Sequence, residues 1–218
     1  MRDERFKPLV DARPEDVPWP EMVWPPPVTA LTGTIVELTL LDPWRDSPEL
    51  FAALDDPRVW AHLLRKPNNS DEYAEILHTL AEKGYLQWLV RLTAPLHGLA
   101  AGAVVGTTAY LDVSVADALV EIGSTAYSPT VWASTINPEC KLLLMTLAFE
   151  TLHAGRVQLK TDIRNARSQQ AIARLGARYE GVLRRHKRRV DGSMRDSVMF
   201  SVIAEEWPEV KAGLQSRL

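Results

Sequence analysis

Residues 120–180 constrain the fold more than any other part of the chain. They begin with an apolar segment at 120–127, continue with a helix that opens at Asn137-Pro138-Glu139, and return in a second strand-like segment at 156–163. Strand, helix and strand within about 45 residues predict a βαβ unit, which requires a parallel strand pair and a right-handed crossover.

The start of the long helix is a predicted anion site. Asn137 is a preferred N-cap residue and Pro138 is suited to the first helical position. The backbone N–H groups of such a helix end point outward and favour a negatively charged ligand. A second, shorter helix is expected from Asn165 to Leu175, where Gly176 ends it.

The remaining segments predict a mixed α/β (α+β) fold. The expected elements are a strand at 34–41, helices at 48–54 and from a Ser70 cap to Gly84, strands at 85–93 and 103–113, a hairpin of 177–190 and 194–204 around Asp191-Gly192, and a short helix after Glu206-Trp207-Pro208. Strands that precede and follow the βαβ unit predict a mostly antiparallel sheet with one parallel pair, flanked by helices.

Residues 1–33 are expected to form an extended N-terminal arm, with one domain at 34–218. Seven of the 15 prolines lie in this arm, which excludes a helix or an inner strand there. Trp19 and Trp24 either pin the arm to the domain or reach a partner subunit or the substrate, and the first interpretation is favoured. A homodimer is left open.

Composition excludes several classes of protein. A net charge of −3 does not indicate nucleic-acid binding, and no apolar run reaches the length of a membrane helix. The single cysteine, Cys140, allows neither an internal disulfide nor a cysteine-based metal site, and its apolar neighbours favour a core position. We therefore expect a soluble cytoplasmic protein without a bound metal.

A set of short motifs runs through the second half of the chain: Glu121-Ile122-Gly123, Leu147-Ala148-Phe149-Glu150, the strand at 156–162, Asn165-x-x-Ser168, Leu175-Gly176-Ala177 and Glu180-Gly181. Together they resemble the GNAT-superfamily acetyltransferases of the RimJ/RimL type. The resemblance covers about residues 34–218. The resemblance implies a fold in which the two parallel strands splay apart.

The resemblance also implies a binding site for acetyl-CoA, which is a cosubstrate. The pantetheine arm would pair with the first strand near Ile122, Ser124 and Tyr127, and with Asn165. The pyrophosphate would lie at the helix start, with donors from Ser134, Thr135, Asn137 and Lys141.

The predicted phosphate loop departs from the family pattern. The family sequence Gln/Arg-x-x-Gly-x-Gly/Ala is replaced by Trp132-Ala133-Ser134-Thr135-Ile136-Asn137, and Glu139 is expected to add negative charge beside the phosphates. The chain is therefore expected to bind CoA more weakly than a protein that carries the family's phosphate-loop sequence.

Candidate catalytic residues follow from the same resemblance. Ser168 would protonate the departing thiolate, although Asn165 and Ser168 also read as a plain capping pair. Glu121 is the preferred general base, with a strand-edge ion pair as the alternative. His186 is a second candidate because an imidazole titrates near neutral pH.

The densest basic run is Arg-Arg-His-Lys-Arg-Arg at 184–189. It reads either as a solvated strand edge or as a surface that attracts an acidic substrate or the CoA 3′-phosphate, and an RNA surface lacks interleaved aromatic residues. The predicted function is acetyl transfer from acetyl-CoA to a primary amine, on a protein N-terminus or a small molecule, by direct attack. The alternative is a non-catalytic CoA-binding or scaffold protein on the same fold.

Overall fold

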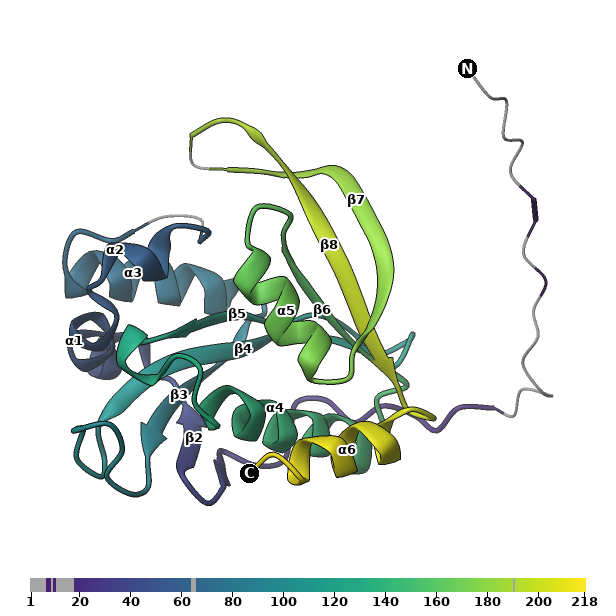
Figure 1. Cartoon of the computed structure of the whole chain (residues 1–218), viewed down its shortest axis with the longest axis horizontal. Helices are drawn as coiled ribbons and strands as arrows, with labels where there is room; N and C mark the ends of the chain where they lie inside the picture. Colours follow the sequence, from purple (N-terminus) through teal and green to yellow (C-terminus); the bar gives the residue numbers. More distant parts are fainter. Residues whose placement is uncertain (1–6, 9, 11–17, 64–65, 190) are drawn as a thin grey trace.

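The computed structural model describes residues 7–8, 10, 18–63, 66–189 and 191–218. In this part of the chain the strands form one sheet in the order β1-β2-β3-β4-β5-β6-β8-β7 (Figure 1). The strands are β1 Ala30–Thr32, β2 Val36–Leu40, β3 Leu86–Leu92, β4 Val104–Ser114, β5 Leu119–Tyr127, β6 Arg156–Asp162, β7 Arg178–Arg188 and β8 Met194–Ile203. The helices are α1 Pro43–Leu54, α2 Pro57–Trp60, α3 Ser70–Glu82, α4 Ile136–Thr146, α5 Ala166–Arg174 and α6 Trp207–Gln215.

The predicted fold class is confirmed. Neighbouring strands pair antiparallel except β5 and β6, which are parallel and are joined by α4. The β7–β8 hairpin extends beyond the rest of the sheet (Figure 1).

Helices cover both faces of the sheet, and each face has its own apolar core. One core joins α1, α2 and α3 to the sheet through Leu50, Val59, Tyr73 and Leu89. The other is larger and places α4, α5 and α6 against the opposite face. The helix sequences agree with this packing. α1 and α3 are amphipathic and bury one side against the sheet, while α4 is apolar nearly all round and is buried on several sides.

Several predicted boundaries need correction. The prediction that Asn137 caps the long helix is wrong: α4 begins at Ile136, and Thr135 is its N-cap residue without a capping side-chain bond. Ser70 is likewise the first residue of α3, and the cap is Asn69, whose side chain accepts from the Glu72 N–H. Two further elements, β1 and α2, were not predicted, and they are only three and four residues long.

From residue 19 on, the N-terminal segment lies against the domain, whereas Val10 is exposed and lies away from it (Figure 1). The Trp19 Nε1 donates to the His153 carbonyl at 2.9 Å, and the Trp24 ring meets Tyr110 edge-on at 6.1 Å between centroids. Both indoles therefore pin this segment, as the favoured interpretation had it. Cys140 is fully buried, and burial raises its thiol pKa to about 11, so it is a core residue.

Candidate active site

The parallel strands β5 and β6 separate soon after they pair. Their register holds for Leu119, Val120 and Glu121 against Arg156, Val157 and Gln158, and no pairing between them follows in the described chain. Beyond Glu121, β5 therefore presents a strand edge toward β6 whose backbone groups are not used in the sheet. A ligand with amide groups can bind to such an edge as an added strand would.

A β-bulge bends β5 at the point of separation. The register with β4 shifts between the pairs Thr107–Ala126 and Ala109–Gly123, and Ser124 has φ of +48°. Bulges turn a strand away from its neighbour, so this one contributes to the splay. Two predicted pantetheine contacts, Ile122 and Ser124, lie in this segment. The carbonyl of the third, Tyr127, is already used, because it accepts from Trp132 Nε1 at 2.9 Å.

Residues 128–135, which include the short 3-10 helix Pro129–Val131, lead from the C-terminal end of β5 to the start of α4. Ser134 uses its hydroxyl within the turn, donating to the Val131 carbonyl at 2.6 Å and accepting from the Ile136 N–H at 3.3 Å. Thr135 and Asn137 flank the first helical residue, Ile136. This helix end has the outward N–H groups and the dipole of an anion site. Two donors are missing from the set, because the Ile136 N–H already donates to Ser134 and Pro138 has no N–H.

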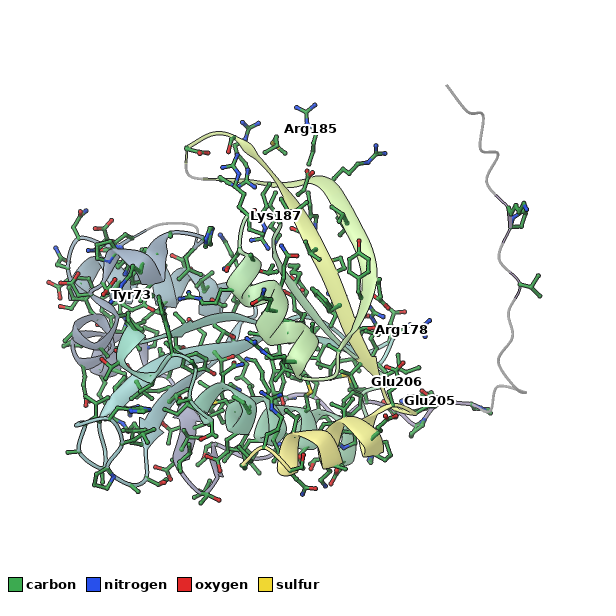
Figure 2. All side chains as sticks on the ribbon, in the orientation of Figure 1. Tyr73, Arg178, Arg185, Lys187, Glu205 and Glu206 are labelled. Carbon is green, nitrogen blue, oxygen red and sulfur yellow. The ribbon has the colours of Figure 1, made fainter. Side chains whose placement is uncertain are left out.

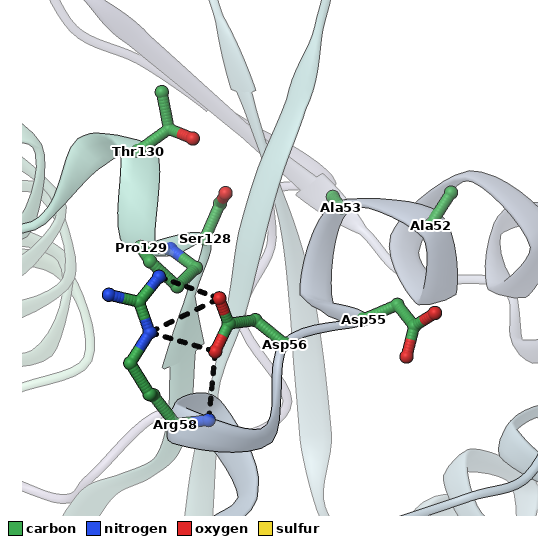
Figure 3. Close-up of a pocket in the computed structure, with 8 residues that line it drawn as sticks. All are labelled: Ala52, Ala53, Asp55, Asp56, Arg58, Ser128, Pro129 and Thr130. Atoms are coloured by element: carbon green, nitrogen blue, oxygen red, sulfur yellow. Dashed lines mark hydrogen bonds and ion pairs between the residues drawn. The ribbon is translucent and has the colours of Figure 1, made fainter.

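Two arginines lie over the indole of Trp132, the residue that stands where the family's phosphate loop has Gln or Arg. The Arg167 Cζ is 3.4 Å from the centroid of the Trp132 ring, and the Arg58 Cζ is 5.5 Å from it. Arg58 is held by a bidentate pair with Asp56, which has one N–O distance of 2.6 Å, at a pocket of about 350 Å³ between the end of α1 and Ser128 (Figure 3). Arg167 has no hydrogen bond or ion pair in the described part of the chain, so its guanidinium donors are available beside α4.

Glu139 does not point toward the start of α4, and the expectation that it places charge beside the phosphates is wrong. Its carboxylate is buried and accepts three backbone hydrogen bonds from the β1–β2 turn, from Thr34 at 2.5 Å, Ile35 at 2.9 Å and Val36 at 3.0 Å. The carboxylate therefore ties α4 to the edge of the sheet.

Lys141 is also directed into the protein. Its Nζ donates to the hydroxyls of Thr108 and Thr125, both at 3.0 Å, and the residue is only 3% exposed. Burial lowers its pKa to about 8. In this arrangement Lys141 lies beneath β4 and β5 and does not reach the surface at the helix start.

Asn165 and Ser168 begin α5 next to the C-terminal end of β6. The Asn165 Oδ1 accepts from the Ser168 N–H at 3.0 Å, so the two residues do form the expected capping pair. The Ser168 hydroxyl has no partner in the described chain and is half-buried. The cap therefore leaves this hydroxyl available for another role.

Glu121 lies at the last paired position before the strands separate. It is 2% exposed, and its Oε2 accepts from Lys160 Nζ at 2.6 Å and from Gln158 Nε2 at 3.0 Å. The same ammonium pairs with Asp112 at 2.6 Å. Burial raises the pKa of the Glu121 carboxyl, while Lys160 acts in the opposite direction.

His186 lies on the same side of the sheet but on β7. Its Nδ1 is 3.0 Å from the Ser197 Oγ. Burial, followed by the charges of Lys160 and Lys187, lowers its pKa, so the imidazole is neutral at pH 7 and can accept a proton. The structure thus brings Glu121 to the fork of the strands and sets His186 on the edge strand of the sheet, beyond β6 and β8.

Comparison with known proteins agrees with this geometry. The family model for the acetyltransferase (GNAT) domain matches residues 37–178. A solved structure from T. thermophilus, described as an acetyltransferase, is 37% identical, with a TM-score of 0.79 over 90% of this chain and all of its own chain, 100%. A GCN5-related N-acetyltransferase from Brucella melitensis is 28% identical, with a TM-score of 0.79 over 88% of this chain and 86% of its own.

A more distant structure shares the fold alone. Mycobacterium smegmatis RimJ in complex with CoA-disulfide is 19% identical, with a TM-score of 0.69 over 83% of this chain and 88% of its own. No curated protein matches the sequence. The chain belongs to the GNAT acetyltransferase family, and the prediction that it is an N-acetyltransferase is confirmed.

Among the residues that the structure describes, no helix combines the length and the apolar character that a membrane span needs.

Proposed function

We propose that the chain transfers the acetyl group of acetyl-CoA to a primary amine by direct attack, without a covalent enzyme intermediate. The observation that carries this proposal is the separation of β5 from β6 immediately after Glu121 and Gln158. The free edge of β5 offers backbone partners for the pantetheine amides, and the starts of α4 and α5 lie beside the same opening. The acetyl carbonyl would then lie next to Glu121.

The proposed reaction forms one bond and breaks one. The neutral amine nitrogen attacks the thioester carbonyl carbon, a carbon–nitrogen bond forms, and the carbon–sulfur bond breaks. The amine proton passes to Glu121, directly or through water, and the Ser168 hydroxyl protonates the departing thiolate. Glu121 then releases its proton to solvent and the Ser168 oxygen takes one up, so one proton moves from nitrogen to sulfur overall. The raised pKa of Glu121 supports its role as the base, and neutral His186 is the second candidate.

Trp132 and Arg167 are proposed to replace the missing phosphate loop. A guanidinium stacked on an indole is held in a fixed orientation and can still donate to phosphate oxygens at its edge. Arg167 stands in the first turn of α5, next to the start of α4, where the pyrophosphate is proposed to bind. Sequence reasoning missed this arginine because its position depends on a contact with Trp132, which is distant in the chain.

The acceptor class remains part of the proposal. The proposed acceptor is either a protein N-terminus, as for a RimJ/RimL-type enzyme, or a small-molecule amine. The proposed location is the cytosol, where acetyl-CoA is available. The altered phosphate loop is the observation behind the alternative, a non-catalytic CoA-binding or scaffold protein on the same fold. Isothermal titration with acetyl-CoA, combined with a thiol-release assay on peptide and small-amine acceptors, separates them. A protein that binds no acetyl-CoA at millimolar concentration would contradict the proposed function.

A further inference from the structure

The β7–β8 hairpin places two cations opposite each other. Lys187 and Arg195 are cross-strand partners, which brings their Cβ atoms to about 5 Å. Like charges at directly opposed positions destabilise a strand pair. Lys187 lies on the inner side of the hairpin, whereas Arg185 extends away from it (Figure 2).

Neither cation has a hydrogen bond or an ion pair within the described chain. Both side chains are half-buried, and the Arg195 Nε is fully buried without a partner. The nearby carboxylate of Asp162 is already used, because Arg189 binds both of its oxygens, at 2.7 and 2.8 Å. Burial lowers the pKa of both Lys187 and Arg195, because each charged side chain is partly removed from water.

Strand register places this pair on the same face of the sheet as Glu121. Glu121 is opposite Gln158, and Lys160 is two residues further along β6 on the same face. Asp162, opposite Ser197 on β8, continues that face, and Arg195 follows two residues from Ser197. The other face carries Val157, Leu159 and Val198, which pack in the core with α4. The proposed pyrophosphate site at α4 therefore belongs to the other face, so Lys187 and Arg195 are not placed to bind it.

The opposite charge is in excess at the other end of this face. Asp112 and Glu121 share the single ammonium of Lys160. The face thus has a surplus of negative charge at the fork of the strands and a surplus of positive charge at the hairpin. The two ends lie along one face of β6, which runs from Gln158, opposite Glu121, to Asp162, opposite Ser197.

We propose that the acceptor is an amine that also carries a carboxylate, the combination found in an amino acid. The carboxylate accepts hydrogen bonds from Arg195 and Lys187, and the amine is held at the Glu121 end, where the acetyl group arrives. This inference rests on the proposed acetyl transfer and adds the chemical class of its substrate.

The test compares acceptors that differ only in the carboxylate. Common α-amino acids, β-alanine and γ-aminobutyrate are assayed by thiol release, each against its amide. Peptides that begin with Asp or Glu are assayed against those that begin with Asn or Gln. Because the amide lacks the charge-assisted hydrogen bonds of the carboxylate, kcat/KM should be about 10- to 100-fold higher for the carboxylate in at least one series. The series that shows the preference identifies a free amino acid or a peptide as the source.

Variants then assign the preference to the hairpin. Arg195→Gln and Lys187→Gln should each reduce the ratio of carboxylate to amide kcat/KM by about 10-fold or more, while the amide rate stays nearly constant. Arg185→Gln removes the same charge from the outer side and should leave the ratio unchanged. A second readout needs no catalysis: the preferred carboxylate should raise the melting temperature of the wild type but not of Arg195→Gln.

Two results overturn the inference. One is equal use of carboxylates and amides by an enzyme that acetylates them. The other is a carboxylate preference that survives both hairpin variants. In each case acetyl transfer itself stands. Absence of acetyl-CoA binding would instead overturn the proposed function.

Discussion

Glu139→Gln is predicted to destabilise the fold without improving CoA binding. The carboxylate accepts three backbone N–H groups across a separation of more than 100 residues, namely those of Thr34, Ile35 and Val36. Gly33 permits this approach, because a Cβ there would lie 2.6 Å from Glu139 Cδ. A glutamine amide keeps one acceptor oxygen and turns its NH₂ toward the remaining donor.

The magnitude follows from these bonds. Losing the charge weakens each retained bond by about 1 kcal/mol, and a buried donor without a partner costs about 1–3 kcal/mol. With two retained bonds and one donor left without a partner, the free energy of unfolding should fall by about 3–5 kcal/mol. For a chain of this size the melting temperature should fall by roughly 6–20 °C.

Urea unfolding followed by tryptophan fluorescence measures the change, with Glu75→Gln as the control. Glu75 is exposed on α3, so its neutralisation should alter stability by less than about 0.5 kcal/mol. CoA affinity, titrated at a temperature where both variants are folded, should match that of the wild type. A Glu139→Gln protein with wild-type stability and tighter CoA binding would refute the assignment of this carboxylate to the β1–β2 turn.

The remaining predictions concern charge and catalysis. The pKa of Lys141 is about 8 in the folded protein, below its ordinary value of 10.5. Between these two pH values the unfolded chain binds more protons than the folded one, so the free energy of unfolding rises with pH, by about 3 kcal/mol in total. Lys141→Met should lose this rise, and equal pH slopes for the two proteins in urea unfolding would contradict the prediction. Arg167→Gln should weaken CoA binding by about 10- to 100-fold in calorimetry while Arg174→Gln, at the other end of α5, leaves it unchanged; equal affinities would remove Arg167 from the phosphate site. Ser168→Ala should lower kcat about 10- to 1000-fold with CoA affinity intact, because the cap uses the Ser168 backbone N–H; unchanged kcat would leave the residue only its place in the cap.

Local signals in the sequence predicted the fold well. The βαβ unit, the strand alternation and the Asp191-Gly192 turn each depend on neighbouring residues, and the corresponding strands and helices are present. The start of α4 could not be fixed in this way. Proline is accepted throughout the first helical turn, where N–H groups lack partners anyway, so Pro138 is equally compatible with a start at Ile136.

The charged residues of the site were harder to place. Whether Glu139 and Lys141 face solvent or the interior depends on contacts with the β1–β2 turn and with Thr108 and Thr125, and no local pattern encodes them. The pairing of Lys187 with Arg195 was equally hidden. The hairpin register shifts between Leu183 and Lys187, so counting outward from the turn does not give the face on which each cation lies.

A crystal structure of the protein with CoA is the decisive experiment for the proposed site. We expect the pantetheine arm between the edge of β5 beyond Glu121 and the edge of β6 beyond Gln158, with its amides bonded to the β5 backbone near Ile122 and Ser124. The pyrophosphate should lie against the first turn of α4, within reach of Arg167. CoA bound elsewhere, with β5 and β6 still separated and nothing between them, would contradict it.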